Sequence, residues 1–574
     1  MNLSFLFLLL SIPVVLAYFF GLYILGSLGQ VVGYYLRRAS RTRKELLLAR
    51  VQTEQRAYAS THPKRAPAND EDGWEEVEGY AAGTAANGAK AGEDWKGIIG
   101  FFHPFCNAGG GGERVLWAAI RANQKRWPDA VCVVYTGDHD VDKAAILKRV
   151  ENRFNIHLHP PTVHFLYLST RRYVLSSTWP HFTLLGQSLG SLILAYDAFS
   201  LLVPDIFIDT MGYAFALALS SFLFPAVPTG AYVHYPTIST DMLASLSPNG
   251  QGVNAGAGVG WKGFAKRHYW SLFARLYCLV GSTVDVVMTN STWTQSHIRS
   301  LWGPRRARRL RSAKASETDI DVVFPPVAVE ELTDAIDVSP ESESKRGPTI
   351  IYIAQFRPEK NHTLIIEAFA KLVAQHNAFP SFPNTPPKLV LVGSVRDSDD
   401  ATRVYNLRLL AHERKIKEKV EFVCDASWPQ ILYWLQCASV GVNGMWNEHF
   451  GIGVVEYQAA GLISVVNDSG GPKLDIVVEI DGEPTGNMQP MNHQVFEVPS
   501  FHASTVEEYA SAFANALSLS SAETSAMRLR ARKSALRFTD RGFAEKWVKN
   551  MERMVQLQEL RTRKPGGFLT MIEI

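Results

Sequence analysis

Two glutamates in the second half of the chain are spaced in a way that could bind a sugar. Glu448 and Glu456 lie eight positions apart, and the residues from Phe450 and Gly451 onward are typical of a buried helix start. The free N–H groups at such a start suit a phosphate. A carboxylate beside them suits hydroxyls, because it accepts two hydrogen bonds in a fixed geometry. The alternative interpretation of the same spacing is an ordinary helix that has one acidic residue before it and a second acidic residue within it.

A second phosphate-binding pattern occurs early in the chain. The apolar run at 98–105 predicts a buried strand, and a helical pattern follows four consecutive glycines, which are Gly109, Gly110, Gly111 and Gly112. Strand, glycines and helix are the arrangement by which α/β sheets cradle phosphates. The pattern is neither GxGxxG nor a P-loop, so a flexible turn is the alternative.

Cationic and histidine side chains follow two other predicted strands. Arg357 and Lys360 come just after the strand at 349–355, and His234 ends the strand at 229–236. Parallel sheets bind ligands at the carboxyl ends of their strands. Two cations are suited to binding a diphosphate. The histidine is less informative, because a lone histidine is more often structural than catalytic.

These groups together predict a nucleotide-sugar site. The cations would bind the diphosphate, and the two glutamates would bind the hydroxyls. A further loop would contribute Gly470 and Gly471 to the donor site. Because cations and helix N-termini can neutralise the diphosphate, we expect no metal ion.

Alternating strand and helix patterns predict two doubly wound α/β domains that face a cleft. We expect an N-terminal domain at 96–335 and a C-terminal domain with terminal helices at 345–574, joined by a short polar linker. Two apolar stretches, 183–204 with Asp197 as its one acid and 211–233 with no charge, are long enough to span a membrane. For the second, a buried helix and strand or a shallow membrane-docking face explains the pattern better.

The first 36 residues contain no Asp, Glu, Lys or Arg and predict a transmembrane anchor at 1–36. A cleaved signal peptide fits less well, since no basic region precedes the apolar one. A basic flank and a flexible linker at 37–95 follow. The positive-inside rule then places the rest of the chain in the cytosol.

Composition excludes other classes of function. The 574 residues carry 58 basic and 55 acidic side chains, a net charge of +3, which gives no support to nucleic-acid binding. The five cysteines are scattered and form no CxxC pair. That usage indicates a reducing compartment and argues against a zinc site or a disulfide framework.

Five segments in order resemble the retaining glycosyltransferases of GT-B architecture. They are FFHPFCNAGGGGERVLW, AYVHYPTIS, AQFRPEKNH, NEHFGIGVVEYQAAG and NDSGGPKLDIV, and the fourth contains that family's E-x7-E motif. Together they are similar to the fungal form of one branch. Its members are GDP-mannose-dependent α-1,2-mannosyltransferases that extend the dolichol-diphosphate-linked oligosaccharide of the N-glycan pathway at the endoplasmic reticulum.

The resemblance implies a role for each residue. Lys360 would stabilise the leaving GDP, helped by the four-glycine loop and the N–H groups of Phe450 and Gly451. Glu448 would hold the donor mannose and Glu456 the ribose, with His234 near the sugar. Many members carry an arginine five residues before the lysine, where this chain has Gln355; Arg357 would replace that cation.

The resemblance also implies the setting. The chain would use GDP-mannose as co-substrate with no cofactor, and would add the fourth and fifth mannoses with retention. It would sit in the endoplasmic reticulum membrane through one N-terminal span, with other mannosyltransferases of the pathway as candidate partners. Two alternatives stay open: the same fold with another linkage or donor, and a catalytically silent nucleotide-sugar-binding scaffold.

Overall fold

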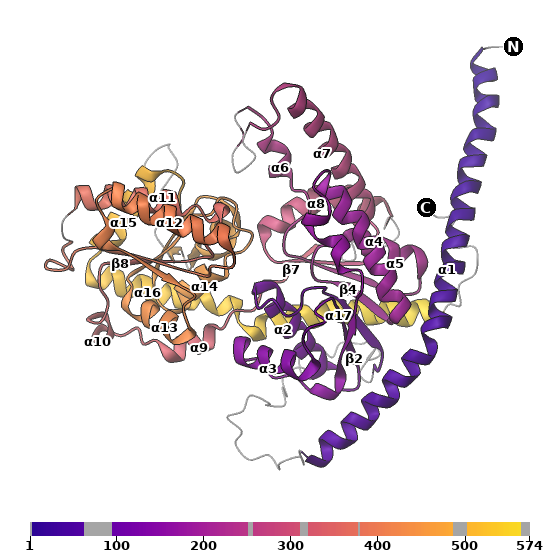
Figure 1. Cartoon of the computed structure of the whole chain (residues 1–574), viewed down its shortest axis with the longest axis horizontal. Coiled ribbons are helices and arrows are strands. Elements are labelled where there is room, and N and C mark those ends of the chain that lie inside the picture. Colours follow the sequence, from indigo (N-terminus) through magenta and orange to yellow (C-terminus); the bar gives the residue numbers. More distant parts are fainter. Residues whose placement is uncertain are drawn as a thin grey trace.

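The computed structural model describes residues 3–61, 95–248, 250, 256–309, 320–376, 379–480, 482–485 and 502–563. They form two α/β domains side by side, with a long N-terminal helix along the outer side of the first (Figure 1). A C-terminal helix crosses from the second domain back to the first.

Each domain is built on a parallel sheet of short apolar strands, as predicted. The first sheet has seven strands in the order β3-β2-β1-β4-β5-β6-β7, and the second has six in the order β10-β9-β8-β11-β12-β15. The strands of the first sheet are β1 Ile98–Phe102, β2 Val131–Thr136, β3 Val163–Tyr167, β4 Ile206–Asp209, β5 Thr229–Val233, β6 Val286–Thr289 and β7 Ile320–Val322. Those of the second are β8 Thr349–Ile353, β9 Lys388–Gly393, β10 Val420–Cys424, β11 Val440–Asn443, β12 Ile463–Asn467 and β15 His502–Ala503. A hairpin of β13 Glu479–Ile480 and β14 Glu483–Pro484 stands apart.

The strand order reverses direction once in each sheet. The reversal lies between β1 and β4 in the first sheet and between β8 and β11 in the second. Connections on either side of such a point leave to opposite faces of the sheet and open a crevice at the strand carboxyl ends. The two crevices therefore supply the ligand-binding edges of a GT-B fold.

Helices cover both faces of the first sheet. One apolar core joins the sheet to the outer helix layer, which consists of α1 Leu3–Thr61, α4 Thr183–Leu201, α5 Ala214–Leu223, α7 Gly260–Gly281 and α8 Thr292–Arg309. A second core covers the opposite face and includes α2 Gly111–Arg126, α3 Lys143–Phe154 and α17 Asp540–Arg563. The predicted uncharged segment at 211–233 is thus the helix α5 followed by the strand β5.

Helices also enclose the second sheet in a single core. They are α9 Val329–Ala335, α11 His362–Gln375, α12 Ser398–Glu413, α13 Trp428–Cys437, α14 Ile452–Ala459, α15 Val506–Ser518 and α16 Ser521–Ala535. The short helix α6, Thr240–Ser245, belongs to the first domain and lies between α7 and α8.

The N-terminal helix is longer than the predicted anchor. It runs from Leu3 to Thr61, since it contains neither glycine nor proline from Tyr34 onward. Lys44 Nζ donates to Asp205 Oδ1 at 2.8 Å and ties the helix to the first domain. The basic flank predicted at 37–95 is therefore helical as far as Thr61, and the linker predicted beyond it lies, up to residue 94, outside the described residues.

Two predicted domain boundaries differ from the structure. Val329 and Leu332 of α9 belong to the core of the second domain, so the first domain ends before residue 335. Conversely, Trp547 of α17 lies in the core of the first domain and donates from Nε1 to Asn123 Oδ1 at 3.1 Å. The apolar face of α17 packs in the core of the first domain. The position of α17 in the sequence, after the second domain, did not predict that it returns to the first.

One helix in the described part of the chain is long and apolar enough to cross a membrane by composition. It is α4, with 44% of its apolar window buried. Its inner side packs in the first domain, where Leu194, Ala195 and Ala198 have no exposed surface.

Candidate active site

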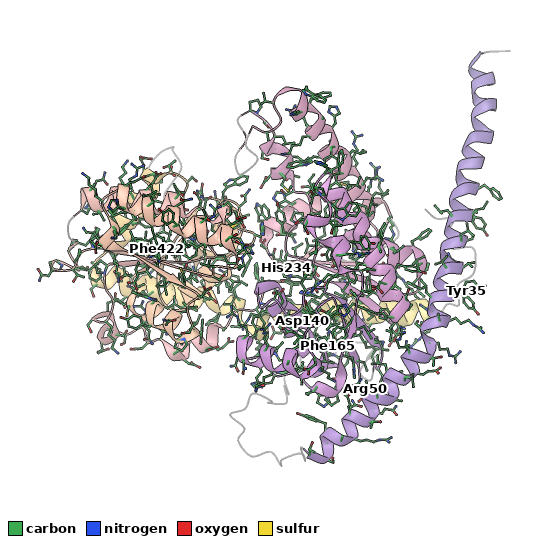
Figure 2. All side chains as sticks on the ribbon, viewed as in Figure 1. Tyr35, Arg50, Asp140, Phe165, His234 and Phe422 are labelled. Atoms are coloured by element: carbon green, nitrogen blue, oxygen red, sulfur yellow. The ribbon has the colours of Figure 1, made fainter. Side chains whose placement is uncertain are left out.

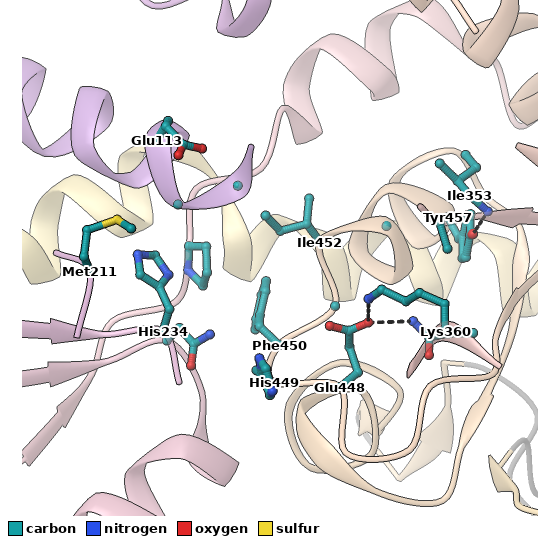
Figure 3. Close-up of a pocket in the computed structure, with 18 residues that line it drawn as sticks. Glu113, Met211, His234, Ile353, Lys360, Glu448, His449, Phe450, Ile452 and Tyr457 are labelled. Atoms are coloured by element: carbon teal, nitrogen blue, oxygen red, sulfur yellow. Dashed lines mark hydrogen bonds and ion pairs between the residues drawn. The ribbon is translucent and has the colours of Figure 1, made fainter. Parts of the chain in front are cut away.

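A cavity of about 450 Å³ lies between the two domains (Figure 3). The first domain contributes the start of α2 and the ends of β4, β5 and β6, and the second contributes the ends of β8 and β11 and the start of α14. Figure 2 shows His234 on the side of the first domain that faces the second. The side chains and glycines that line the cavity include Gly111, Gly112, Glu113, Met211, His234, Asn290, Lys360, Asn443, Glu448, His449, Phe450, Gly451 and Gly453.

The four-glycine loop opens α2 beside the cavity. Gly109 has a left-handed φ of 79°, and Gly110 N donates to Glu113 Oε2 at 2.6 Å, which closes the first turn. A Cβ on Gly111 would come within 2.6 Å of Ile452 Cδ1 in the second domain. A larger residue at 111 would require the Ile452 side chain to move, so glycine suits the place where the two domains approach. Gly111 and Gly112 line the cavity, whereas Gly109 and Gly110 shape the loop from outside its lining.

Lys360 and Glu448 form an ion pair on the wall made by the second domain. Lys360 Nζ donates to Glu448 Oε2, and Asn443 Nδ2 donates to the same oxygen at 3.4 Å (Figure 3). Burial by itself would raise the pKa of Glu448, but the charge of Lys360, the neighbouring His449 ring and these hydrogen bonds hold it below its ordinary value. Glu448 is therefore ionised at neutral pH and has oxygens able to accept from hydroxyls.

The start of α14 faces the cavity next to this pair. Gly451 has a φ of 103°, a conformation that favours glycine, and it caps the helix. Gly471 N donates to Glu448 O at 2.8 Å, and a Cβ on Gly471 would lie 2.7 Å from Phe450 Cα. Gly470 and Gly471, which we predicted to bind the donor, thus pack behind the Glu448 loop and do not line the cavity.

His234 faces the cavity from the end of β5. Burial, together with the nearby His103, lowers the pKa of His234 to about 4. Its Nε2 is buried and has no hydrogen-bond partner within the part of the chain that the structure describes. A neutral imidazole with one unsatisfied nitrogen can accept from, or donate to, a sugar hydroxyl.

Two family models match this chain. The one described as "ALG11 mannosyltransferase N-terminus" matches residues 96–302, and "Glycosyl transferases group 1" matches residues 335–487. A Neurospora crassa protein named GDP-Man:Man(3)GlcNAc(2)-PP-Dol alpha-1,2-mannosyltransferase is 62% identical over 547 residues, which cover 93% of this chain and 94% of that protein. The chain belongs to this mannosyltransferase family.

The human member of the family is 44% identical to this chain over 464 residues, covering 80% of this chain and 87% of the human protein. Solved structures show the same fold at low identity. A Rickettsia africae glycosyltransferase aligns with 82% of this chain and 100% of its own, with a TM-score of 0.51 and 14% identity. The N-terminal domain of a Candida albicans trehalose-6-phosphate phosphatase aligns with 82% of this chain and 98% of its own, with a TM-score of 0.55 and 13% identity.

Two residues predicted to bind the donor in this mannosyltransferase lie away from the cavity lining. Arg357 turns toward Glu359, with 3.8 Å between Nη1 and Oε1. Glu456 lies one turn inside α14, half-buried, and burial raises its pKa against the opposing charges of Arg114 and Arg153. Their predicted roles in the family stay predictions.

Sequence reasoning missed a buried pair behind the glycine loop. His103 follows β1; its Nδ1 lies 2.7 Å from Thr210 Oγ1, and its Nε2 lies 3.8 Å from Glu113 Oε1. Burial raises the pKa of Glu113, but the nearby His103 and the hydrogen bond from Gly110 N hold it below its ordinary value. A histidine at a strand carboxyl end was the available signal, the same one that singled out His234.

Contacts across the cleft hold the two domains of the mannosyltransferase together. Asn447 Nδ2 donates to Asp241 Oδ2 at 2.7 Å. The His449 ring stacks against Tyr235 and Trp293, with centroids 4.1 and 5.5 Å apart. The two domains therefore touch across the cleft, and we refer to this arrangement as closed.

Proposed function

We propose that this protein transfers mannose from GDP-mannose to a dolichol-diphosphate-linked oligosaccharide in α-1,2 linkage. The observation that carries the proposal is the Lys360–Glu448 pair in an interdomain cavity, in a chain 62% identical to a protein named for this reaction. That relative's name gives Man(3)GlcNAc(2)-PP-Dol as the acceptor. The first mannose added would then be the fourth, and the next the fifth.

In this proposal the second domain binds the donor. Lys360 meets the diphosphate, assisted by the N–H groups at Phe450 and Gly451. Glu448 accepts from hydroxyls of the mannose, which replace part of its present bond to Lys360. Glu456, close to Gly453 in the first turn of α14, accepts from the ribose hydroxyls. Arg357 is the candidate second cation once its side chain leaves Glu359.

The reaction breaks the bond between mannose C1 and the GDP oxygen and forms a bond from C1 to the acceptor O2. With retention, both events occur on one face of the sugar, and the acceptor hydroxyl gives its proton to the departing phosphate. The protein's contribution is charge on that phosphate and a fixed sugar position. His234, which is neutral at pH 7, contributes to the orientation of the sugar.

We further propose that the reaction needs no metal ion, because Lys360 and the α14 N-terminus meet the diphosphate charge. The test is turnover of the purified enzyme in EDTA, then with Mg²⁺ or Mn²⁺ restored. Activity that is lost in EDTA and returns with the metal would contradict this part of the proposal.

A transfer assay tests the main proposal. Purified protein is incubated with GDP-mannose and a synthetic lipid-linked Man(3)GlcNAc(2) acceptor, and the glycans are sized and digested with an α-1,2-specific mannosidase. We expect growth by two digestible mannoses, and none with UDP-sugars. GDP-mannose binding without transfer to any lipid acceptor would instead favour a scaffold.

We also propose that residues 1–36 anchor the protein in the endoplasmic reticulum membrane, with both domains in the cytosol. The support is the uncharged stretch, the arginines at 37, 38, 41 and 43 beyond it, and the dolichol-linked acceptor named for the relatives. Deleting residues 1–36 should release the protein to the soluble fraction at high salt. Co-purification from digitonin extracts would test other mannosyltransferases as partners.

A further inference from the structure

A second cavity lies on the first domain, apart from the active site. It is a groove of about 520 Å³ between the N-terminal end of α4 and the first half of α7. Its walls are apolar and aromatic and include Phe182, Leu184, Tyr269 and Trp270. Tyr269 fixes its shape, because its hydroxyl accepts from Leu185 N at 3.0 Å and its ring meets Phe182 edge-on at 5.1 Å.

Several large apolar side chains on the surface around the groove are exposed to solvent, which is unfavourable in water. Phe182 is 66% exposed, Trp261 79% and Phe264 62%. Phe182 also has a left-handed φ of 53°, unusual for a bulky residue, and presents its ring to solvent from that conformation. An exposed apolar patch of this kind marks a binding surface.

The helix that forms one wall of the groove carries positive charge. Helix α7 contains Lys262, Lys266, Arg267 and Arg275 and no acidic residue. Lys266 lines the groove, and its ammonium lies 4.8 Å from the centroid of the Trp270 ring. An apolar trough with cations at its rim complements a ligand that joins a hydrocarbon chain to an anionic group.

The position of the groove suits a long ligand that reaches the active site. The first half of α1 and the α6–α7 pair project toward the same end of the molecule (Figure 1). Helix α6, which directly precedes α7 in the chain, carries Asp241, the residue bonded to Asn447 across the cleft. Two consecutive helices therefore lie at the edge of the catalytic cleft (α6) and at the wall of the groove (α7).

We propose that this groove binds the acceptor's polyisoprenoid chain next to its diphosphate, with the diphosphate at Lys266. The proposal rests on the proposed function. The acceptor named for the relatives carries five sugars, three mannoses and two N-acetylglucosamines, and the reacting mannose lies at the far end of this glycan from the diphosphate. A lipid site well away from the cavity is what that length requires. Trp261 and Phe264 are exposed outside the lining of the groove and suit a bilayer surface, whereas the concave trough fits a single chain.

Filling the groove tests the proposal. Ala265 is exposed and lines it, so Ala265→Trp places a ring in the trough, while Ser271→Trp adds the same ring to α7 outside it. With a long-chain acceptor in detergent, we expect Ala265→Trp to raise KM about tenfold at unchanged kcat. KM for a chain-free Man(3)GlcNAc(2) acceptor, and both constants of Ser271→Trp, should match the wild type.

A second variant separates binding from folding. Phe182→Asn removes the exposed ring but places a residue that tolerates φ of 53°. We expect an equal or higher Tm together with a similar KM increase for the long-chain acceptor. Equal effects of Ala265→Trp on both acceptors, or none on either, would overturn the proposal.

A glycan-free photoreactive polyisoprenyl diphosphate gives an answer that does not depend on mannose transfer. Crosslinks should map to residues 180–184 and 265–270 in the wild type and fall about tenfold in Ala265→Trp. Crosslinks elsewhere overturn the groove assignment even if transfer is normal. Absent transfer with these crosslinks present refutes only the proposed function. Weaker binding of Ala265→Trp to acceptor-free vesicles, with KM unchanged in detergent, would assign the groove to bulk membrane and overturn the proposal.

Discussion

The Lys360 ammonium donates directly to the Glu448 carboxylate at the centre of the cleft. The two residues follow β8 and β11, strands that are neighbours in the sheet although they are far apart in the chain. Each charge is paired with the other. In the proposed reaction, donor binding exchanges this bond for bonds to phosphate and hydroxyl.

Removing either member of this pair should cut turnover. We expect Lys360→Ala and Glu448→Ala each to lower kcat about 100-fold or more, the usual scale for a charge-stabilising group in a closed site. Lys371→Ala is the matched control, because Lys371 forms an exposed ion pair with Glu507 in the same domain. Near-normal turnover in both active-site variants would refute their assignment.

Loss of the Asn447–Asp241 hydrogen bond should open the cleft. A charge-assisted bond contributes about 1.5–3 kcal/mol, so Asp241→Ala should shift the closed–open ratio about tenfold or more toward open. Small-angle scattering would detect a larger radius of gyration. Asp399→Ala removes an exposed acid from the first turn of α12 and should leave the radius unchanged; an Asp241→Ala radius equal to that of the control would contradict the prediction.

Cleft closure should weaken as the pH falls. Burial lowers the pKa of His449 from 6.5 to about 4, against the opposing charge of Glu448, so the closed state holds His449 neutral. The open state, in which the ring leaves Tyr235 and Trp293, takes up a proton at the higher pKa. Closure is thus fully favoured above pH 6.5 and is lost progressively as the pH falls toward 4, by up to about 3 kcal/mol.

Scattering between pH 4.5 and 7.5 would measure this effect. Other buried groups also titrate, among them His234 and His362, whose pKa values burial lowers to about 4. The His449→Asn variant isolates one contribution, and its closed fraction should vary less with pH than that of the wild type. Identical profiles would exclude His449 as the titrating group.

Truncating Trp547 should destabilise the first domain although the residue follows the second in sequence. Its ring has no exposed surface and packs beside Phe101 and Phe543, with centroids 6.3 and 5.7 Å away. Trp547→Ala should cost about 3–5 kcal/mol. Hydrogen exchange should show the loss in β1 and β4, while amides of β8 and β9 keep their protection; equal loss in both sheets would contradict this.

The sequence by itself determined both sheets and the central pair of the site. Strands such as β1 and β8 are short apolar runs whose pattern is local, and Lys360 and Glu448 follow their strands closely. Topology then brings them together, because parallel strands present their carboxyl ends at one edge. The glycines at 111 and 112 and the start of α14 were predictable for the same reason.

Only the tertiary structure decided which neighbours these groups meet. Arg357 turns to Glu359, and His103 pairs with Glu113 behind the glycine loop. Gly470 supports a loop where we had placed a ligand. Helix α17 belongs to the first domain because its apolar residues pack in the core of that domain. Most of these outcomes depend on contacts between residues distant in the chain, and a local pattern of residue types does not contain the energies of such contacts.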